Sequence, residues 1–429
     1  MSEEVNLVER IEGHLSLDID LERRDGRKIR LEIREGPRLF EGFLKGRDYN
    51  EIPFFASRIC GFCPIVHNLS AIKALENAMN VSVNEQTLDF RRALNCMEFI
   101  QSHSAHLYFL TLPDFTGGEN DVFSLTGKFG GKIKRGIKLR TTINSMIEVL
   151  GGRAVHPLTP RVGGFSKLPS EKILKSELEK LEKMKPIASE TVDLTTGLDY
   201  PDFEAETNYL ALTRDDEIYP IYDGHVITTQ SEEFEVDKYS EIISEETVPY
   251  STSKFSSING DPFLTGALSR VNLNANYLSE NAKIKMENTE IDFPSYNPYH
   301  NNIAQAIEIV HCVDEIERIY TKILNEGIKV IEMLGGELKN EADVEARAGT
   351  GSDAVEAPRG TLFHNYEVNE EGIVTDADIL TPTAQSAANI ERDINMLLSG
   401  LTNQSEEEIK REIRTLIRAY DPCVSCSVH

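Results

Sequence analysis

Four of the six cysteines in this 429-residue chain form two pairs with C-x-x-C spacing. Cys60 and Cys63 lie in the first part of the chain, and Cys423 and Cys426 lie close to its last residue. Two intervening residues allow both sulfurs of a pair to face one ion, and thiolates bind zinc, iron–sulfur clusters and other late transition metals. The spacing therefore predicts a metal site with thiolate ligands.

The two cysteine pairs allow more than one kind of site. A structural zinc site with four thiolates would join the two pairs, but such sites usually occur in small knuckles with their pairs close in sequence. A thioredoxin-like redox pair needs a βαβ setting, which surrounds neither pair. Cys96 and Cys312 lie in helical patterns, so we predict that they are inert thiols in the core. Histidines follow both pairs, at His67 and His429, and histidines so placed can donate hydrogen bonds to a bound thiolate.

The composition indicates a globular protein that does not bind nucleic acid. With 40% hydrophobic and 27% charged residues, the chain can bury a large core. Its 71 acidic and 45 basic residues give a net charge of −26, which repels phosphate backbones and anionic lipid. A run of about 18 apolar residues, as a membrane span requires, does not occur. The acidic first residues do not resemble a signal peptide, so we expect a cytoplasmic protein.

Hydrophobic periodicity predicts the elements that must position the cysteines. Alternating residues from Leu15 to Glu35, on both sides of Asp25-Gly26, predict an N-terminal β-hairpin, and Gly360 to Leu380 predicts a second. Apolar residues that recur at three and four positions predict long helices at 68–79, 86–112, 133–150 and 301–334. We further expect a solvated helix at 172–185, short β-like runs at 203–250 and two helices after the second hairpin.

These elements indicate an α+β fold that is mainly α, in which small peripheral sheets accompany a bundle of long helices. The chain lacks a Ser/Gly-rich linker, so we expect one packed domain over residues 1–429. Within it we distinguish an N-terminal hairpin at 1–50, a helical core at 51–200, an insertion at 201–300, and C-terminal helices and a hairpin at 301–429.

Six motifs, taken together, resemble the large subunit of nickel–iron hydrogenases. They follow the family's order over nearly the whole chain. The motifs are Arg10-Ile-Glu-Gly-His14, Arg38-Leu-Phe-Glu41, Arg58-Ile-Cys-Gly-Phe-Cys-Pro-Ile-Val-His67, Glu356-Ala-Pro-Arg-Gly-Thr-Leu-Phe-His364, Thr381-Pro-Thr383 and Asp421-Pro-Cys-Val-Ser-Cys-Ser-Val-His429. Gly36-Pro-Arg-Leu-Phe and Ala419-Tyr-Asp-Pro-Cys are most similar to the cytoplasmic, bidirectional group of sulfhydrogenases and methanogen hydrogenases. The resemblance implies the hydrogenase large-subunit fold and the reversible oxidation of dihydrogen to protons and electrons.

The resemblance also implies how the cysteines are used. All four paired cysteines would bind nickel, and Cys63 and Cys426 would also bridge to an iron that carries one CO and two cyanides. Cys60 and Cys423 would then be terminal ligands of nickel. In the family the terminal cysteine of the C-terminal pair takes a proton and passes it to the glutamate that matches Glu12. From the residues alone, Glu12 would be an exposed carboxylate at a strand start.

Other matched residues surround the expected diatomic ligands. Arg359 matches an arginine that overhangs the metals and, with Pro358, Pro382 and Thr383, encloses the cyanides. A fixed cation and a hydroxyl suit cyanide because its nitrogen accepts hydrogen bonds. Asp421 matches an acid that pairs with this arginine, although an aspartate before proline is also a common turn residue.

The resemblance implies that His67 would hydrogen-bond a bridging thiolate.

The resemblance also implies a second, harder ion. Glu41, a backbone carbonyl near Ile379 and His429 would hold a divalent ion, usually magnesium, which takes few protein ligands and several waters. From the pattern alone, Glu41 would be a surface residue of an amphipathic helix.

Two positions depart from the family pattern. Gln101-Ser-His103 replaces the Gln-Asp-His of many relatives, which removes an acidic residue near the expected site. Phe62 stands between the first pair of cysteines, where a smaller apolar residue is common, so we expect slower access of gases. His103 and His106, three apart on a predicted helix, are expected to support the site or pack in the core.

The chain needs a partner to carry electrons, since the four organised cysteines leave none for an iron–sulfur cluster. The resemblance implies an iron–sulfur small subunit, together with flavin and iron–sulfur subunits of the diaphorase or heterodisulfide-reductase type. Two other functions stay open at this point: a non-catalytic relative, as in respiratory complex I, and a structural zinc-binding scaffold. Their metal contents would differ from that of a hydrogenase.

Overall fold

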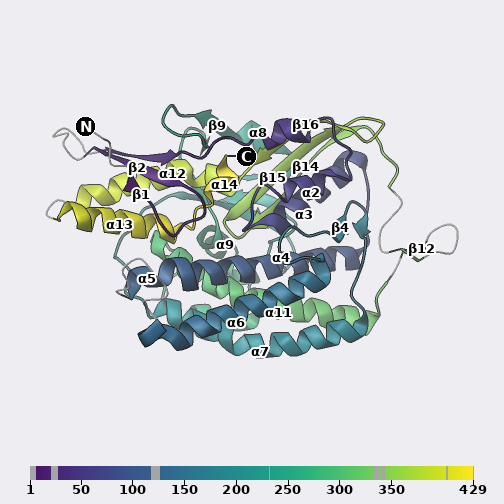
Figure 1. Ribbon diagram of the computed structural model, residues 1–429, viewed down its shortest axis with the longest axis horizontal. Helices are drawn as coiled ribbons and strands as arrows, with labels where there is room; N and C mark the ends of the chain where they lie inside the picture. Colours follow the sequence, from purple (N-terminus) through teal and green to yellow (C-terminus); the bar gives the residue numbers. More distant parts are fainter. Residues whose placement is uncertain are drawn as a thin grey trace.

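The computed structural model describes residues 6–20, 28–116, 126–230, 232–329, 331–332, 338–339, 344–401 and 404–428. Its helices are α1 (Phe40–Leu44), α2 (Ile52–Ala56), α3 (Pro64–Met79), α4 (Glu85–Ala105), α5 (Leu112–Phe115), α6 (Thr126–Gly151), α7 (Glu171–Thr196), α8 (Tyr239–Ile242), α9 (Ala267–Asn274), α10 (Glu280–Glu287), α11 (Asn301–Glu326), α12 (Pro382–Gly400), α13 (Glu406–Ala419) and α14 (Val424–Ser427). Figure 1 shows α4, α6, α7 and α11 stacked across the lower half of the molecule.

The strands form small sheets in the upper half of Figure 1 and at its edges. They are β1 (Asn6–Leu7), β2 (Leu15–Asp20), β3 (Lys28–Ile33), β4 (Pro160–Arg161), β5 (Gly164–Phe165), β6 (Asn208–Thr213), β7 (His225–Thr228), β8 (Glu233–Phe234), β9 (Ile243–Thr247), β10 (Lys254–Ile258), β11 (Phe263–Thr265), β12 (Ile331–Glu332), β13 (Leu338–Lys339), β14 (Gly349–Ala357), β15 (Gly360–Val368) and β16 (Val374–Leu380). The larger sheets have the orders β1-β2-β3, β11-β6-β7-β8 and β14-β15-β16. The predicted α+β class, mainly α, is confirmed.

The helices begin and end where local chemistry requires it. Asn84 caps α4 by accepting a hydrogen bond of 2.8 Å from the Thr87 amide. The predicted helix at 301–334 ends instead at Glu326, because Gly327 adopts φ 75° and ψ 155°, a non-helical conformation that glycine reaches more easily than other residues. The predicted helix at 86–112 divides into α4, a π-helical turn at His106–Thr111, and α5. The predicted helix at 172–185 continues through Pro186 as α7.

Both predicted hairpins are present. In the first, Leu15 of β2 pairs with Ile33 of β3, and the predicted turn at Asp25-Gly26 lies outside the described residues. In the second, β15 pairs with β16, and Gly372 closes the turn with φ 78°. A third strand, β14, was not predicted, and it pairs with β15 from Gly349↔Val368 to Ala357↔Gly360.

The hairpin between β14 and β15 is tight. Only Pro358 and Arg359 separate Ala357 from its partner Gly360, so Arg359 lies at the tip of a two-residue turn. Gly360 has φ 134°, and a Cβ there would lie 2.3 Å from Cγ2 of Thr265. The fold therefore presents Arg359 on rigid backbone.

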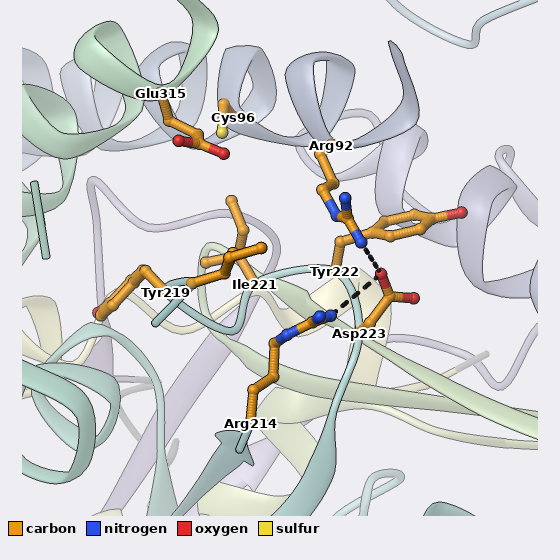
Figure 2. A pocket seen from close by; sticks show the side chains of 9 residues that line it. Arg92, Cys96, Arg214, Tyr219, Ile221, Tyr222, Asp223 and Glu315 are labelled. Carbon is orange, nitrogen blue, oxygen red and sulfur yellow. Dashed lines mark hydrogen bonds and ion pairs between the residues drawn. The ribbon is translucent and has the colours of Figure 1, made fainter. Parts of the chain in front are cut away.

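Helix α3 packs directly on β14, and buried charges hold the two together. Lys73 of α3 lies 2.8 Å from Asp353 of β14 and 3.2 Å from Asp223. Figure 2 shows Asp223 also reaching Arg92 of α4 and Arg214, at 2.8 and 3.4 Å. These contacts fix α3, whose first turn follows the first cysteine pair.

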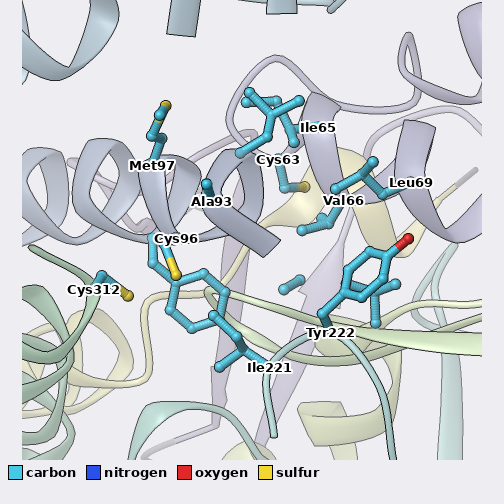
Figure 3. Close-up of a cluster of buried hydrophobic side chains, with 14 of the residues drawn as sticks. Cys63, Ile65, Val66, Leu69, Ala93, Cys96, Met97, Ile221, Tyr222 and Cys312 are labelled. Carbon is cyan, nitrogen blue, oxygen red and sulfur yellow. The ribbon is translucent and has the colours of Figure 1, made fainter. Parts of the chain in front are cut away.

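The largest apolar cluster packs around the same region. Figure 3 shows Cys63 beside Ile65 and Val66 at the start of α3, and Cys96 of α4 and Cys312 of α11 belong to the same cluster. Both Cys96 and Cys312 are fully buried, as predicted. The first cysteine pair is therefore anchored in the main core.

The close contact between α3 and β14 leads to a stability prediction. A Cβ at position 351 would lie 2.2 Å from the backbone nitrogen of Ala78. We expect Gly351→Ala to lower the free energy of unfolding by about 1–3 kcal/mol, because backbone must move to accept the methyl group. Gly130→Ala on α6 is a matched control, since no atom lies within 4 Å of the added methyl. Thermal unfolding followed by circular dichroism measures both, and an equal melting temperature for the two variants would contradict the packing argument.

Candidate metal centre

The structure brings the four paired cysteines together. The sulfurs of Cys60, Cys63, Cys423 and Cys426 all lie within 4.8 Å of one another, and all four residues are buried. Neighbouring sulfurs are 3.2 Å apart for Cys60 and Cys423, 3.1 Å for Cys63 and Cys426, and 3.2 Å for Cys423 and Cys426. Sulfurs this close can share one ion.

Each cysteine pair lies where a helix begins. Cys63 immediately precedes α3 and Cys423 immediately precedes α14. The amide of Phe62 donates to Sγ of Cys60 over 3.2 Å, and the amide of Cys423 donates to Oγ1 of Thr383 over 2.9 Å. The bond from Phe62 favours the thiolate form of Cys60, which is the form that binds metal, and the bond to Thr383 fixes the backbone at Cys423.

Arg38 joins the two cysteine pairs through backbone. Its guanidinium donates to the carbonyl of Ile59, at 2.5 Å, and to the carbonyl of Ser425. These carbonyls precede Cys60 and Cys426. The amide of Arg38 also donates to the carbonyl of Val428 over 2.9 Å. Arg38 belongs to one of the sequence motifs, but this bridging contact could not be read from the sequence.

Burial and nearby charge set the pKa values of the cysteine thiols. Burial raises the pKa of Cys423 and of Cys426 well above the ordinary thiol value. At Cys60, burial opposes ionisation, but hydrogen bonds from the neighbouring thiols and the charge of Arg359 lower the pKa overall. A divalent cation would displace the remaining protons. Four buried sulfurs that lie this close together fit a late transition metal such as nickel.

Glu12 lies against the C-terminal pair. Its Oε2 accepts from Sγ of Cys423 at 3.1 Å and from the amide of Ser425 at 2.9 Å, while the Ser425 hydroxyl donates to Oε1. The backbone of Glu12 also forms a parallel bridge with Cys423. Burial and the negative charge of Cys60 raise the pKa of Glu12. Glu12 is thus a half-buried carboxylate in contact with a cluster sulfur, and not an exposed one.

Arg359 reaches the cluster from the hairpin tip. Its Nη2 lies 2.7 Å from Oδ1 of Asp421, and its Nε donates to the Asp421 carbonyl over 2.7 Å. Nη1 donates to the hydroxyl of Ser102 over 3.2 Å, so the serine of the unusual Gln-Ser-His segment contacts this arginine. The guanidinium also lies 5.4 Å from the ring of Phe62. These contacts fix a buried positive charge beside the sulfurs.

A fully buried ion cluster supports the hairpin tip. Arg270 of α9 pairs with Glu308 of α11 at 2.6 Å and with Glu356 of β14 at 2.9 Å. Its guanidinium also donates to the carbonyls of Ala357 and Pro358, at 2.9 and 3.0 Å. The sequence predicted Pro358 but gave no signal for Arg270, because a lone arginine in a helix resembles a surface residue.

The two histidines of α4 and its π-helical turn support this region. His103 lies 2.9 Å from Glu308. His106 contacts Gln305 at 2.6 Å and lies 3.9 Å from Asp421. Both histidines are buried, and each contacts a residue of α11.

Glu98 is a buried carboxylate that the sequence analysis missed. It lies on α4 and accepts hydrogen bonds from the amides of Ile65 and Val66, at 2.7 and 2.9 Å, so it caps the first turn of α3. Burial raises the pKa of Glu98 to about 8 even though these two bonds lower it. The sequence held one indication of such a residue. Pro64 begins a helix that the Cys63 side chain does not cap, so the first amides of α3 need an acceptor from another part of the chain.

His67 contacts the C-terminal pair, and Glu41 contacts Ile379. Nε2 of His67 lies 3.7 Å from Sγ of Cys426. The amide of Ile379 donates to Oε1 of Glu41 over 3.1 Å, so these two expected ligands of a hard ion are adjacent. His429, the third, lies outside the described residues. Pro382, predicted near the cyanides, occupies the first turn of α12.

Comparisons with solved structures define the class of protein. The structure of an NAD+-reducing NiFe hydrogenase in the H2-reduced state superposes with a TM-score of 0.86 and 26% identity, covering 99% of this chain and 98% of that chain. The fold is therefore that of a hydrogenase large subunit.

Sequence comparisons identify the family. The family model described as nickel-dependent hydrogenase matches residues 38–122 and 214–429. The alpha subunit of sulfhydrogenase 1 from Pyrococcus furiosus is 34% identical over 426 residues, with 99% of this chain and 97% of the relative covered. An F420-non-reducing hydrogenase subunit from Methanothermobacter thermautotrophicus is 30% identical, with 98% and 93% covered. The chain belongs to the nickel-dependent hydrogenase family. Within that family it is a large, catalytic subunit.

These findings confirm the predicted resemblance to sulfhydrogenases and methanogen hydrogenases. These relatives are named as hydrogenase subunits. Across the described parts of the chain, no helix is both long and apolar enough to cross a bilayer.

The cluster geometry predicts which cysteine substitutions affect metal binding. Cys423→Ser should abolish metal assembly, because a buried hydroxyl replaces a sulfur that contacts two others and Glu12. Cys312→Ser, a substitution of a buried thiol outside the cluster, should leave the metal content unchanged. Elemental analysis of the purified complexes measures both. Full nickel content in Cys423→Ser would remove Cys423 from the ligand set.

Proposed function

We propose that this chain catalyses the reversible oxidation of dihydrogen to protons and electrons and passes the electrons to an iron–sulfur small subunit. One observation carries the proposal: four buried sulfurs lie within 4.8 Å of one another, with a carboxylate and a guanidinium held beside them. A structural zinc site needs only the sulfurs. The added acid and cation are suited to handling protons and anionic ligands at a metal.

The donor set fits a nickel–iron centre. We propose that Cys60, Cys63, Cys423 and Cys426 hold nickel, and that Cys63 and Cys426 also hold an iron with one CO and two cyanides. When bound, such a centre supplies the heterolytic cleavage of dihydrogen. Arg359, Pro358, Pro382 and Thr383 would enclose the cyanides.

Proton movement is assigned to Cys423 and Glu12. The sulfur of Cys423 accepts the proton and passes it over 3.1 Å to Oε2 of Glu12. The amide and hydroxyl of Ser425 hold the carboxylate in this orientation. Burial and the negative charge of Cys60 raise the pKa of Glu12, which makes this carboxylate a better proton acceptor than an exposed glutamate.

Asp421 keeps the catalytic arginine in place. Two hydrogen bonds of 2.7 Å join it to Arg359, one from Nη2 to its carboxylate and one from Nε to its carbonyl. Asp421 also accepts from Gln305 at 3.0 Å. These bonds fix the rotation of the guanidinium, so its charge stays beside the sulfurs without reorganisation.

We propose that Glu41, the carbonyl of Ile379 and His429 hold a magnesium or similar divalent ion. The adjacency of Glu41 and Ile379 supports this set. A hard ion with oxygen ligands would share little chemistry with the sulfur cluster, so the two sites would select different metals.

The surface near Cys60 supports docking of an electron-accepting partner. Leu39 is 69% exposed and Phe43 43% exposed, and the guanidinium of Arg47 lies 4.0 Å from the Phe43 ring. Arg58, two residues before Cys60, is also exposed. Exposed aromatic, aliphatic and arginine side chains are typical of protein interfaces. This apolar and basic face differs from the chain as a whole, which has a net charge of −26.

We propose that this face binds the iron–sulfur small subunit. Further subunits, of the flavin and iron–sulfur diaphorase type or the heterodisulfide-reductase type, would then carry electrons to a soluble acceptor in the cytoplasm. The large subunit would work as one domain over residues 1–429. The two cysteine pairs come from opposite ends of the chain and meet at one site. This supports a single domain, because neither end alone supplies all four sulfurs.

Metal analysis and infrared spectroscopy of the purified complex test the proposal. We expect one nickel per large subunit and one iron in excess of the iron held by iron–sulfur clusters, with one CO and two cyanide bands in the region free of protein absorption. Zinc alone would indicate a structural scaffold. A fully matured complex with neither nickel nor diatomic bands would indicate a non-catalytic relative.

Glu12→Gln tests the proton route. We expect nickel and iron contents to stay unchanged while the rate of dihydrogen oxidation falls by roughly 10²–10⁴-fold, because an amide cannot relay a proton. Glu177→Gln is a control on α7, where another buried carboxylate pairs with Lys180 at 2.9 Å, and it should keep its rate. Normal turnover in Glu12→Gln would show that the proton leaves by another group.

A further inference from the structure

Three buried side chains form a hydrogen-bonded row that begins at Cys426. Nε2 of His67 lies 3.7 Å from Sγ of Cys426. Nδ1 of His67 lies 3.2 Å from Nε2 of His364, and Nδ1 of His364 lies 2.7 Å from the hydroxyl of Tyr366. His67, His364 and Tyr366 are all fully buried. We call this row the imidazole relay.

The fold explains why the three side chains lie next to one another. His364 and Tyr366 are alternate residues of β15, so both side chains leave the same face of the sheet. His67 approaches that face from the first turn of α3, which packs against β14 and β15. His364 pairs across the sheet with Ile379, next to the proposed site of the hard ion.

The chemistry at Cys426 fixes the direction of every bond in the row. A metal-bound thiolate has no proton and can only accept, so His67 must donate from Nε2. A neutral imidazole carries one N–H, so Nδ1 of His67 must then accept from Nε2 of His364. By the same rule, Nδ1 of His364 accepts from the Tyr366 hydroxyl, which keeps its proton at neutral pH.

We propose that Tyr366 and His364 are positioning residues that polarise the hydrogen bond from His67 to the bridging thiolate. The inference rests on the proposed function, because it takes Cys426 to be a metal ligand. Each donor in the row strengthens the next, since hydrogen bonds in a buried chain polarise one another. The effect is to draw electron density from the sulfur of Cys426 and so from the metals.

The opposite direction is chemically possible and defines the contrary case. If Cys426 kept its proton, the thiol could donate to Nε2 of His67, and both imidazoles would carry their proton on Nδ1. Tyr366 would then accept from His364 instead of donating. The tautomers of His67 and His364 therefore distinguish the two cases, and no proton is gained or lost by the row as a whole.

The hydroxyl of Tyr366 can be removed with little change in shape. In Tyr366→Phe, Nδ1 of His364 loses the hydroxyl donor, and the row no longer favours donation toward sulfur. We expect nickel and iron contents to remain those of the wild-type complex, while the CO band moves to lower wavenumber, because a more electron-rich thiolate increases back-donation to CO. Loss of packing alone would not shift this band in one direction.

Tyr209→Phe is the matched control. Tyr209 is also buried, and its hydroxyl donates a hydrogen bond of 2.9 Å to the carbonyl of Ser295. Its CO band should stay at the wild-type position. An unshifted band in Tyr366→Phe, in a complex that contains both metals, would overturn the relay. Absence of CO and cyanide bands in the wild-type complex would instead overturn the proposed function.

A measurement on the wild-type complex tests the relay without a variant. Imidazole nitrogen-15 chemical shifts separate Nε2–H from Nδ1–H tautomers. We expect His67 and His364 to be protonated on Nε2 in the metal-loaded complex, assigned by loss of each signal in His67→Asn and His364→Asn. An Nδ1–H tautomer at either histidine would overturn the proposed direction.

Discussion

The architecture depends on one constraint, which is that two segments from distant parts of the chain must present their sulfurs at one point. Cys60 and Cys423 are 363 positions apart in sequence, yet their sulfurs lie 3.2 Å apart. Two N-terminal side chains secure this meeting. Arg38 donates to carbonyls beside both cysteine pairs, and Glu12 bonds to the backbone and side chain of Ser425. Glu12 and Arg38 thus help to hold the segment that carries the second cysteine pair.

Buried charge gives the site a single geometry. Taking ions out of water costs several kcal/mol for each one, and only well-matched partners offset that cost. Arg270 meets this condition with two glutamates and two backbone carbonyls, and Arg359 meets it with Asp421 and Ser102. Such networks tolerate few alternative arrangements, because any shift leaves a charge without its partner. The hairpin tip that carries Arg359 is accordingly rigid before any metal binds.

Much of this arrangement could be predicted from local sequence, and the rest depends on tertiary contacts. Cysteine spacing predicted the ligand set, and hydrophobic periodicity predicted the long helices and both hairpins. Strand β14 was missed because its residues, Gly349–Ala357, include two glycines and do not alternate clearly, and its register is set by packing on α3. Glu98 and Arg270 were missed for a similar reason. A single charged residue in a helical pattern resembles a surface residue until its partners from other helices are known.

The separation of the two cysteine pairs also has a consequence for chain entropy. An ion bound by all four sulfurs closes a loop of some 360 residues, and cross-links that close long loops remove the most freedom from the unfolded chain. Metal binding would thus stabilise the folded state in addition to supporting catalysis. The affinity for the metal would therefore depend on the stability of the whole fold. A substitution that loosens α3 from β14 would also weaken metal binding, because it would make the closure of this loop less favourable.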